Sequence, residues 1–216
     1  MHIPDGLISP QTYLPALALA VPLWVVAARR LRARMGDELL PRLAVFTALA
    51  FLLSTLMLPL PGGTSGHLLG VSLLALVFGP WVAFLCYTLV LVLQAVVVGA
   101  GGITALPVNA LTLGLVAAWV TWGGYRLLRG LGETLAVAVA TWLGIMSAAL
   151  VLALVLGLQP VIAQAPDGTP LFFPFGVAVT LPALLVPHAL IAAGEAALTV
   201  LVFRHARKRR WLEATP

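Results

Sequence analysis

Apolar residues fall in long, almost uncharged runs along the chain, and the strict alternation of a barrel strand is absent. A helix needs about 20 mostly apolar residues to cross the hydrocarbon core of a bilayer. The pattern predicts seven apolar spans, at roughly residues 11–28, 43–58, 66–79, 81–98, 106–125, 134–157 and 177–203. The chain is therefore expected to form a bundle of seven transmembrane helices.

The third span is short for a full crossing. It is separated from the fourth only by Gly79-Pro80, a pair that breaks a helix sharply. We expect the two spans to form a tight helical hairpin.

Composition supports a lipid environment for the whole chain. Of the 216 residues, 62% are hydrophobic and 9% are charged, whereas a soluble domain carries roughly 25% charged residues. Open sheets are excluded because their unpaired backbone groups would find no water in hydrocarbon. The expected fold class is an all-α membrane protein with one transmembrane domain, residues 1–216.

Basic residues gather in three clusters, which the positive-inside rule reads as facing the cytoplasm. The loops 59–65, 99–105 and 158–176 contain none of them. We therefore expect a multi-pass protein of the cell inner (cytoplasmic) membrane, with its N-terminus outside and its C-terminus cytoplasmic. The net charge of +5 does not indicate nucleic acid, since no matching motif accompanies it. The basic residues are Arg29, Arg30, Arg32, Arg34 and Arg42, then Arg126 and Arg129, then Arg204, Arg207, Lys208, Arg209 and Arg210.

The first ten residues, MHIPDGLISP, do not resemble the start of a signal peptide, because they lack Lys and Arg and include Asp5. We expect no cleavage, and the bulky second residue disfavours removal of Met1. The amine of Met1, the amide nitrogen of His2 and the imidazole of His2 can then chelate one metal through a five-membered and a six-membered ring. Such a nearly planar set of nitrogens favours nickel or copper.

A fourth ligand is expected from His67, which lies in the segment PGGTSGHLLG on the same side of the membrane as His2. Its glycines permit close approach of the backbone. The alternative is that His67 is an interfacial residue beside a simple turn.

A metal-bound imidazole usually donates its second N–H to a polar group. Ser65, Thr104 and Asn109 are candidates for this role. His188, inside the last span, is a weaker one that could instead serve packing or hydrogen bonding. The role of Glu195, the clearest acid within a span, stays open.

Five segments are distinctive: MHIPDG at the start, PGGTSGHLLG at 61–70, GPWVAFL at 79–85, GGITALPVN at 101–109 and VPHAL at 186–190. Together they resemble the CbiM/NikM family, the substrate-binding (S) components of energy-coupling-factor (ECF) transporters for cobalt and nickel. The resemblance covers nearly the whole chain. It implies a seven-helix S component with metal ligands from Met1, His2 and His67. It also implies partners: a transmembrane coupling (T) protein, two cytoplasmic ATPases and often a small auxiliary membrane protein. The chain departs from the family at Pro107-Val108, which makes the backbone before Asn109 stiffer.

Motifs for enzyme chemistry are missing from the sequence. There is no P-loop and no H-E-x-x-H, so we expect a non-enzymatic subunit without a cofactor whose transported ligand is Co²⁺ or Ni²⁺. The alternative is an ion-coupled secondary carrier that works without ATPases, although such carriers usually bury several acids. The sequence leaves the choice between cobalt and nickel open.

Overall fold

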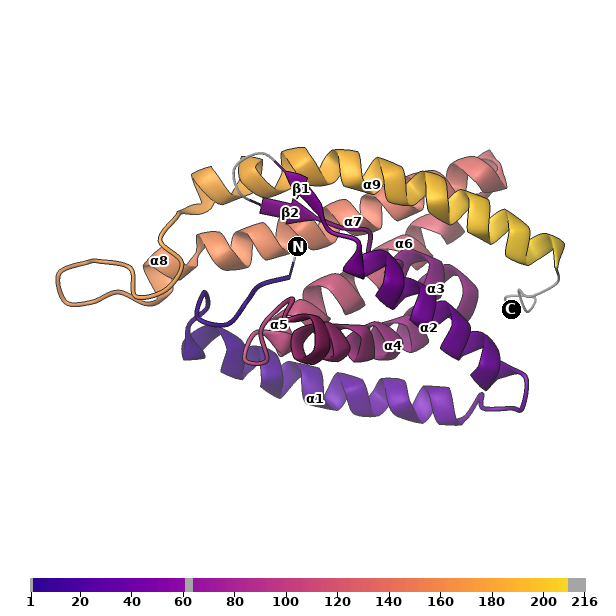
Figure 1. Ribbon diagram of the computed structural model, residues 1–216, viewed down its shortest axis with the longest axis horizontal. Helices are drawn as coiled ribbons and strands as arrows, with labels where there is room; N and C mark the ends of the chain where they lie inside the picture. Colours follow the sequence, from indigo (N-terminus) through magenta and orange to yellow (C-terminus); the bar gives the residue numbers. More distant parts are fainter. Residues whose placement is uncertain (1, 61–63, 210–216) are drawn as a thin grey trace.

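The computed structural model describes residues 2–60 and 64–209, and it is mainly helical (Figure 1). The two strands form a short antiparallel hairpin in which Leu58 pairs with Gly66. The elements are α1 (Pro10–Arg32), α2 (Leu39–Thr55), β1 (Leu58–Leu60), β2 (Thr64–Gly66), α3 (Val71–Phe78), α4 (Pro80–Leu93), η1 (Gln94–Val98), α5 (Leu106–Asn109), η2 (Ala110–Val116), α6 (Ala117–Leu128), η3 (Arg129–Leu131), α7 (Glu133–Gly157), α8 (Gln159–Ile162) and α9 (Val177–Lys208).

Five helical stretches among the described residues are long and apolar enough to span a membrane, and α2 is a shorter apolar helix. α3 has 8 residues and is therefore only about 12 Å long. The expectation of seven spanning helices is not reproduced, because α3 is a half-length helix preceded by a strand hairpin and a non-helical connection. The all-α expectation is corrected by the two strands of three residues each. The five stretches are Pro10–Arg32, Pro80–Val98, Leu106–Leu131, Glu133–Ile162 and Val177–Lys208.

The turn between α3 and α4 has the form that Gly79-Pro80 predicts. Gly79 ends α3 at a φ of 86°, which suits only glycine, and Pro80 opens α4 in the first turn, where no N–H is needed. Pro107 likewise lies in the first turn of α5, so the following helix continues through η2 into α6.

Small residues allow α7 to pack closely between α6 and α9. A Cβ on Gly144 would lie 2.1 Å from the Thr121 hydroxyl on α6, and one on Gly157 would lie 2.4 Å from the Thr180 hydroxyl on α9. Backbones can approach this closely only where side chains are absent, as at other helix contacts within membranes. α7 is thereby fixed in the centre of the bundle.

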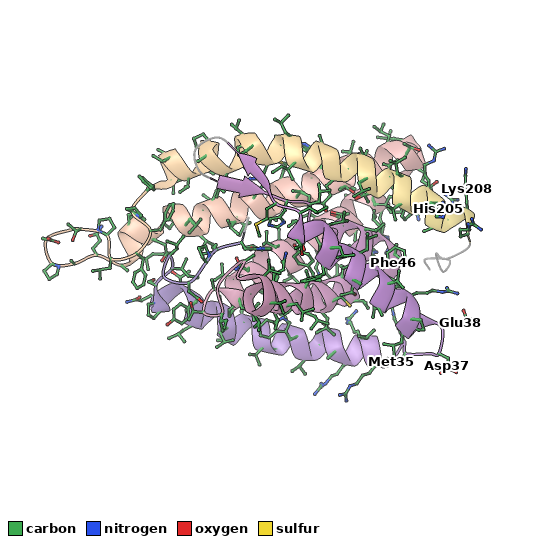
Figure 2. The ribbon with its side chains drawn as sticks, viewed as in Figure 1. Met35, Asp37, Glu38, Phe46, His205 and Lys208 are labelled. Carbon is green, nitrogen blue, oxygen red and sulfur yellow. The ribbon has the colours of Figure 1, made fainter. Side chains whose placement is uncertain are left out.

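All the basic residues that the structure describes lie at or near one end of the bundle, the right-hand end in Figure 1. The Arg34 guanidinium donates to the Phe78 carbonyl at 3.4 Å, so the loop after α1 meets the end of α3. Arg207 pairs with Glu133, which joins the end of α9 to the start of α7. Figure 2 shows Glu38, before α2, and Lys208 at this same end. The chain thus returns to this end after every second pass, although the pass through α3 is only partly helical.

Candidate metal centre

The segment before α1 folds back along the bundle instead of projecting from it (Figure 1). Ile3 and Ile8 are buried, with 1% and 2% of their surface exposed. Asn109, in α5, holds the backbone of Ile3 at both of its polar groups. Its Oδ1 accepts from the Ile3 N–H and its Nδ2 donates to the Ile3 carbonyl, each at 3.0 Å. This bidentate pairing fixes the residue next to His2.

A second attachment is made by Asp5. Its carboxylate accepts the N–H of Ile103 at 3.0 Å and the N–H of Thr104 at 2.8 Å, and it also accepts the Thr104 hydroxyl. The hydrogen bond from that hydroxyl is the main reason that the pKa of Asp5 is lowered. The N-terminal segment is therefore attached to the loop before α5 by a carboxylate that stays charged at neutral pH.

Two glycines leave room for the N-terminal segment. Gly102 donates its N–H to the Ile3 carbonyl at 2.9 Å, and a Cβ at this position would lie 2.4 Å from the Asp5 nitrogen. Gly101 has a φ of 88°, and a Cβ there would lie 3.1 Å from the His2 Cβ. The N-terminal segment thus packs on residues 101–104, and His2 lies directly against them.

His67 follows β2 and precedes α3, and only 2% of its surface is exposed. Its Nδ1 lies 3.2 Å from the carbonyl oxygen of Leu68. The connection to α3 passes through Gly70, which has a φ of 73° and packs on α2 so closely that a Cβ would lie 2.9 Å from Ala50. The same connection is bonded to Glu195 of α9.

The rings of His2 and His67 lie side by side, with centroids 4.5 Å apart and planes at 36°. Burial lowers the pKa of His67 to about 3. Burial, and next the charge of His67, lower the pKa of His2 well below its usual value. Both rings are therefore neutral at neutral pH, which is the form that binds a metal. The Nε2 of His2 is buried and has no hydrogen-bond partner among the described residues.

No group of three His, Cys, Asp or Glu side chains able to hold a metal ion occurs in residues 2–60 and 64–209. Further ligands beside the two imidazoles would therefore have to come from elsewhere, the backbone at the chain start being the nearest source. Met1, the first expected ligand, lies outside the described residues.

The four residues expected to support the ligands differ in their placement. Asn109 and Thr104 lie at the site, but they hold Ile3 and Asp5 and make no described hydrogen bond to an imidazole. His188 is buried and its Nδ1 lies 2.6 Å from the Leu184 carbonyl of its own helix, while its Nε2 has no hydrogen-bond partner among the described residues. Ser65 falls in β2, and its side chain lies outside what the structure describes.

Sequence reasoning did not assign the roles of Asp5 and Glu195. Asp5 stands in the MHIPDG start, but its partners are 98 and 99 residues away along the chain. The partners of Glu195 are backbone N–H groups, which any sequence has, so no motif could mark them. For Glu195 the only signal is an acid inside an apolar span, where an unpaired charge would be costly.

The model of the CbiM family, described as the cobalt uptake substrate-specific transmembrane region, matches residues 2–212. The chain belongs to this family. The resemblance seen in the sequence is thereby confirmed, and the relatives with named functions are cobalt or nickel transport proteins.

Relatives with named functions agree with this assignment. The cobalt transport protein CbiM of Desulforamulus reducens is 32% identical over 94% of this chain and 80% of its own length. The fused nickel transport protein NikMN of Rhodobacter capsulatus is 35% identical over 89% of this chain and 57% of its own length. The chain thus spans less than two thirds of that fused relative. A solved structure of a truncated transition metal transporter superposes with a TM-score of 0.92 at 39% identity, covering 97% of this chain and 99% of the other.

Proposed function

We propose that this chain is the substrate-binding (S) component of an ECF-type transporter, which binds a divalent transition-metal cation with high affinity for uptake. The observation that carries the proposal is the contact between two neutral imidazoles, the half-buried His2 and the buried His67, with ring centroids 4.5 Å apart. A shared metal ion accounts for two neutral imidazoles in contact, since imidazole is the commonest metal ligand in proteins.

The proposed ligand set is completed by the amine of Met1 and the amide nitrogen of His2. The described residues offer no third side chain, whereas the backbone before Ile3 is held against Asn109 at a fixed place. Three nitrogens from adjacent residues impose a nearly planar arrangement. Zinc prefers tetrahedral sites and magnesium prefers oxygen ligands, so the set favours nickel or cobalt.

We propose that the site faces the outside of the cell inner membrane, with the N-terminus outside and the C-terminus in the cytoplasm. The support is the gathering of the described basic residues at the right-hand end of the bundle, away from the N mark (Figure 1). A cation would then enter from the outer face, between the N-terminal segment and the segment that carries His67.

Energy for uptake is proposed to come from two cytoplasmic ATPases through a transmembrane coupling (T) protein, with a small auxiliary membrane protein in some assemblies. The sequence has no P-loop of its own. The alternative, a secondary carrier, needs a buried acid free to exchange the coupling ion. Glu195 is the one buried acid among the described residues, and both of its oxygens already accept backbone N–H groups.

Uptake of nickel or cobalt by cells that express this chain is expected to require ATP hydrolysis by the partners. The measurement is accumulation of radioactive nickel in cells that also express the coupling protein and the ATPases. It is repeated with ATPases whose P-loop lysine is replaced, which should abolish uptake. A protonophore, with ATP maintained by fermentation, should leave uptake nearly unchanged. Uptake that survives the ATPase substitution and collapses with the protonophore would establish the secondary carrier instead.

Asn109→Leu is expected to weaken nickel binding by about 10- to 100-fold, because supporting partners of metal ligands have effects of this size. Leucine has a similar volume but removes both hydrogen bonds to Ile3. The matched control is Thr112→Val, less than one turn further along the same helical stretch, where the hydroxyl bonds only its own helix. Equal dissociation constants for the two variants, measured by competition with a chelator, would remove Asn109 from the site.

A further inference from the structure

Glu195 lies within α9, far from either end of this helix of 32 residues, and only 1% of its surface is exposed. One carboxylate oxygen accepts the N–H of Leu69 at 2.7 Å and the other accepts the N–H of Gly70 at 2.9 Å. Both oxygens are thereby paired, as buried polar groups require. A buried carboxylate with both oxygens on the backbone of another element is therefore a strong attachment between α9 and that element.

The attachment lies immediately after His67. Leu69 and Gly70 are two and three residues further along the chain, and α3 begins at Val71. Gly70 is the N-cap of α3, and the carboxylate from α9 accepts its N–H, which is the bond that an acidic side chain makes to the N-cap residue in a capping box. Negative charge is also favourable at this end of a helix.

The connection between His67 and α3 is held from two sides. On one side is Glu195, and on the other Gly70 packs against α2, where a Cβ would lie 2.9 Å from Ala50. Leu69, the residue before Gly70, is fully buried. With the carboxylate removed, the two N–H groups would be buried without partners, at a cost that favours a shift of the segment.

The two imidazoles of the site are therefore carried by different parts of the bundle. His2 is attached through Ile3 and Asp5 to the loop before α5 and to α5 itself. His67 is attached through Leu69 and Gly70 to α9. The distance of 4.5 Å between the ring centroids depends on both attachments.

We propose that Glu195 is the positioning residue for His67, a clamp that makes the geometry of the metal site depend on α9. The proposal rests on the proposed function of the site. Without the clamp the ligands are still present, but the separation of the two rings is no longer fixed. The cation is then bound more weakly and with a distorted ligand geometry.

Glu195→Gln tests the clamp with almost no change in volume. The amide keeps one oxygen for one of the backbone N–H groups but turns an NH₂ group toward the other. Nickel affinity of the purified protein is expected to fall by about 10- to 100-fold, with a shift in the absorption bands of the bound nickel. The matched control is Thr199→Val, one turn further along α9 and equally buried, for which affinity and spectrum should be unchanged.

A second measurement needs no metal. Hydrogen exchange at Leu69 and Gly70 in the metal-free protein should be faster in Glu195→Gln and in Glu195→Asp, whose carboxylate is one methylene too short to reach. A variant with a lower melting temperature but wild-type affinity and spectrum would show that Glu195 only stabilises the fold, and would overturn the proposal. Failure of the wild-type protein to bind nickel would instead refute the proposed function, while the exchange result would still test the clamp.

Discussion

Addition of a single residue ahead of Met1 is expected to weaken nickel or cobalt binding by about 100-fold or more, which corresponds to about 3 kcal/mol. The extra residue converts the amine of Met1 into an amide, so the terminal chelate loses its basic nitrogen. It also adds bulk next to His2, which lies close against Gly101. The measurement is a nickel titration of purified protein in competition with a chelator.

The control for this experiment is a tag of the same composition at the C-terminus. That end of α9 lies with the basic residues at the right-hand end of the bundle, away from the N mark (Figure 1). The affinity of the C-terminally tagged form should therefore match that of the untagged protein. Mass spectrometry of both proteins establishes which residue is first. Equal affinity for the two tagged forms would mean that the amine is not a ligand.

Much of the helical framework could be predicted because lipid imposes a simple rule. Backbone groups in hydrocarbon must be paired within the segment, so each long apolar run becomes a helix with boundaries close to those of the run. The turn at Gly79-Pro80 was also predictable, since a glycine with positive φ followed by proline leaves few other conformations.

The region between α2 and α3 could not be predicted in the same way. Its apolar residues read as the start of a span, yet residues 67–70 are not helical and α3 begins only at Val71. The reason is tertiary: Glu195, from the other end of the sequence, supplies the hydrogen bonds that a helical turn would have supplied. A non-helical segment at this depth is tolerated where it is buried in protein and its polar groups are paired.

The candidate ligands could be named from the sequence, but their surroundings could not. His2 followed from the chemistry of a chain start and His67 from a glycine-rich segment on the same side. Neither pattern contains the Asp5 contact with Thr104 or the Asn109 contact with Ile3, because each joins residues about 100 positions apart. These contacts turn two histidines into a pair with a defined separation.

His67→Ala is expected to abolish nickel binding while the protein still folds, and His205→Ala is expected to have no effect on binding. His67 lies in contact with His2, whereas His205 is exposed on α9 at the basic end, beside Lys208 (Figure 2). Both substitutions remove one imidazole, so they differ only in where that imidazole lies in the protein. Loss of the fourth nitrogen leaves a three-nitrogen chelate that a competing chelator should strip.

The measurement is the rise in melting temperature on addition of nickel, which separates binding from folding. A ligand present at 1,000 times its dissociation constant stabilises a folded protein by about 4 kcal/mol. Wild type and His205→Ala should show the full rise, and His67→Ala should show none, although its metal-free form melts cooperatively. A nickel-dependent rise of wild-type size in His67→Ala would mean that the ring beside His2 is not a ligand, and that the cation is held elsewhere.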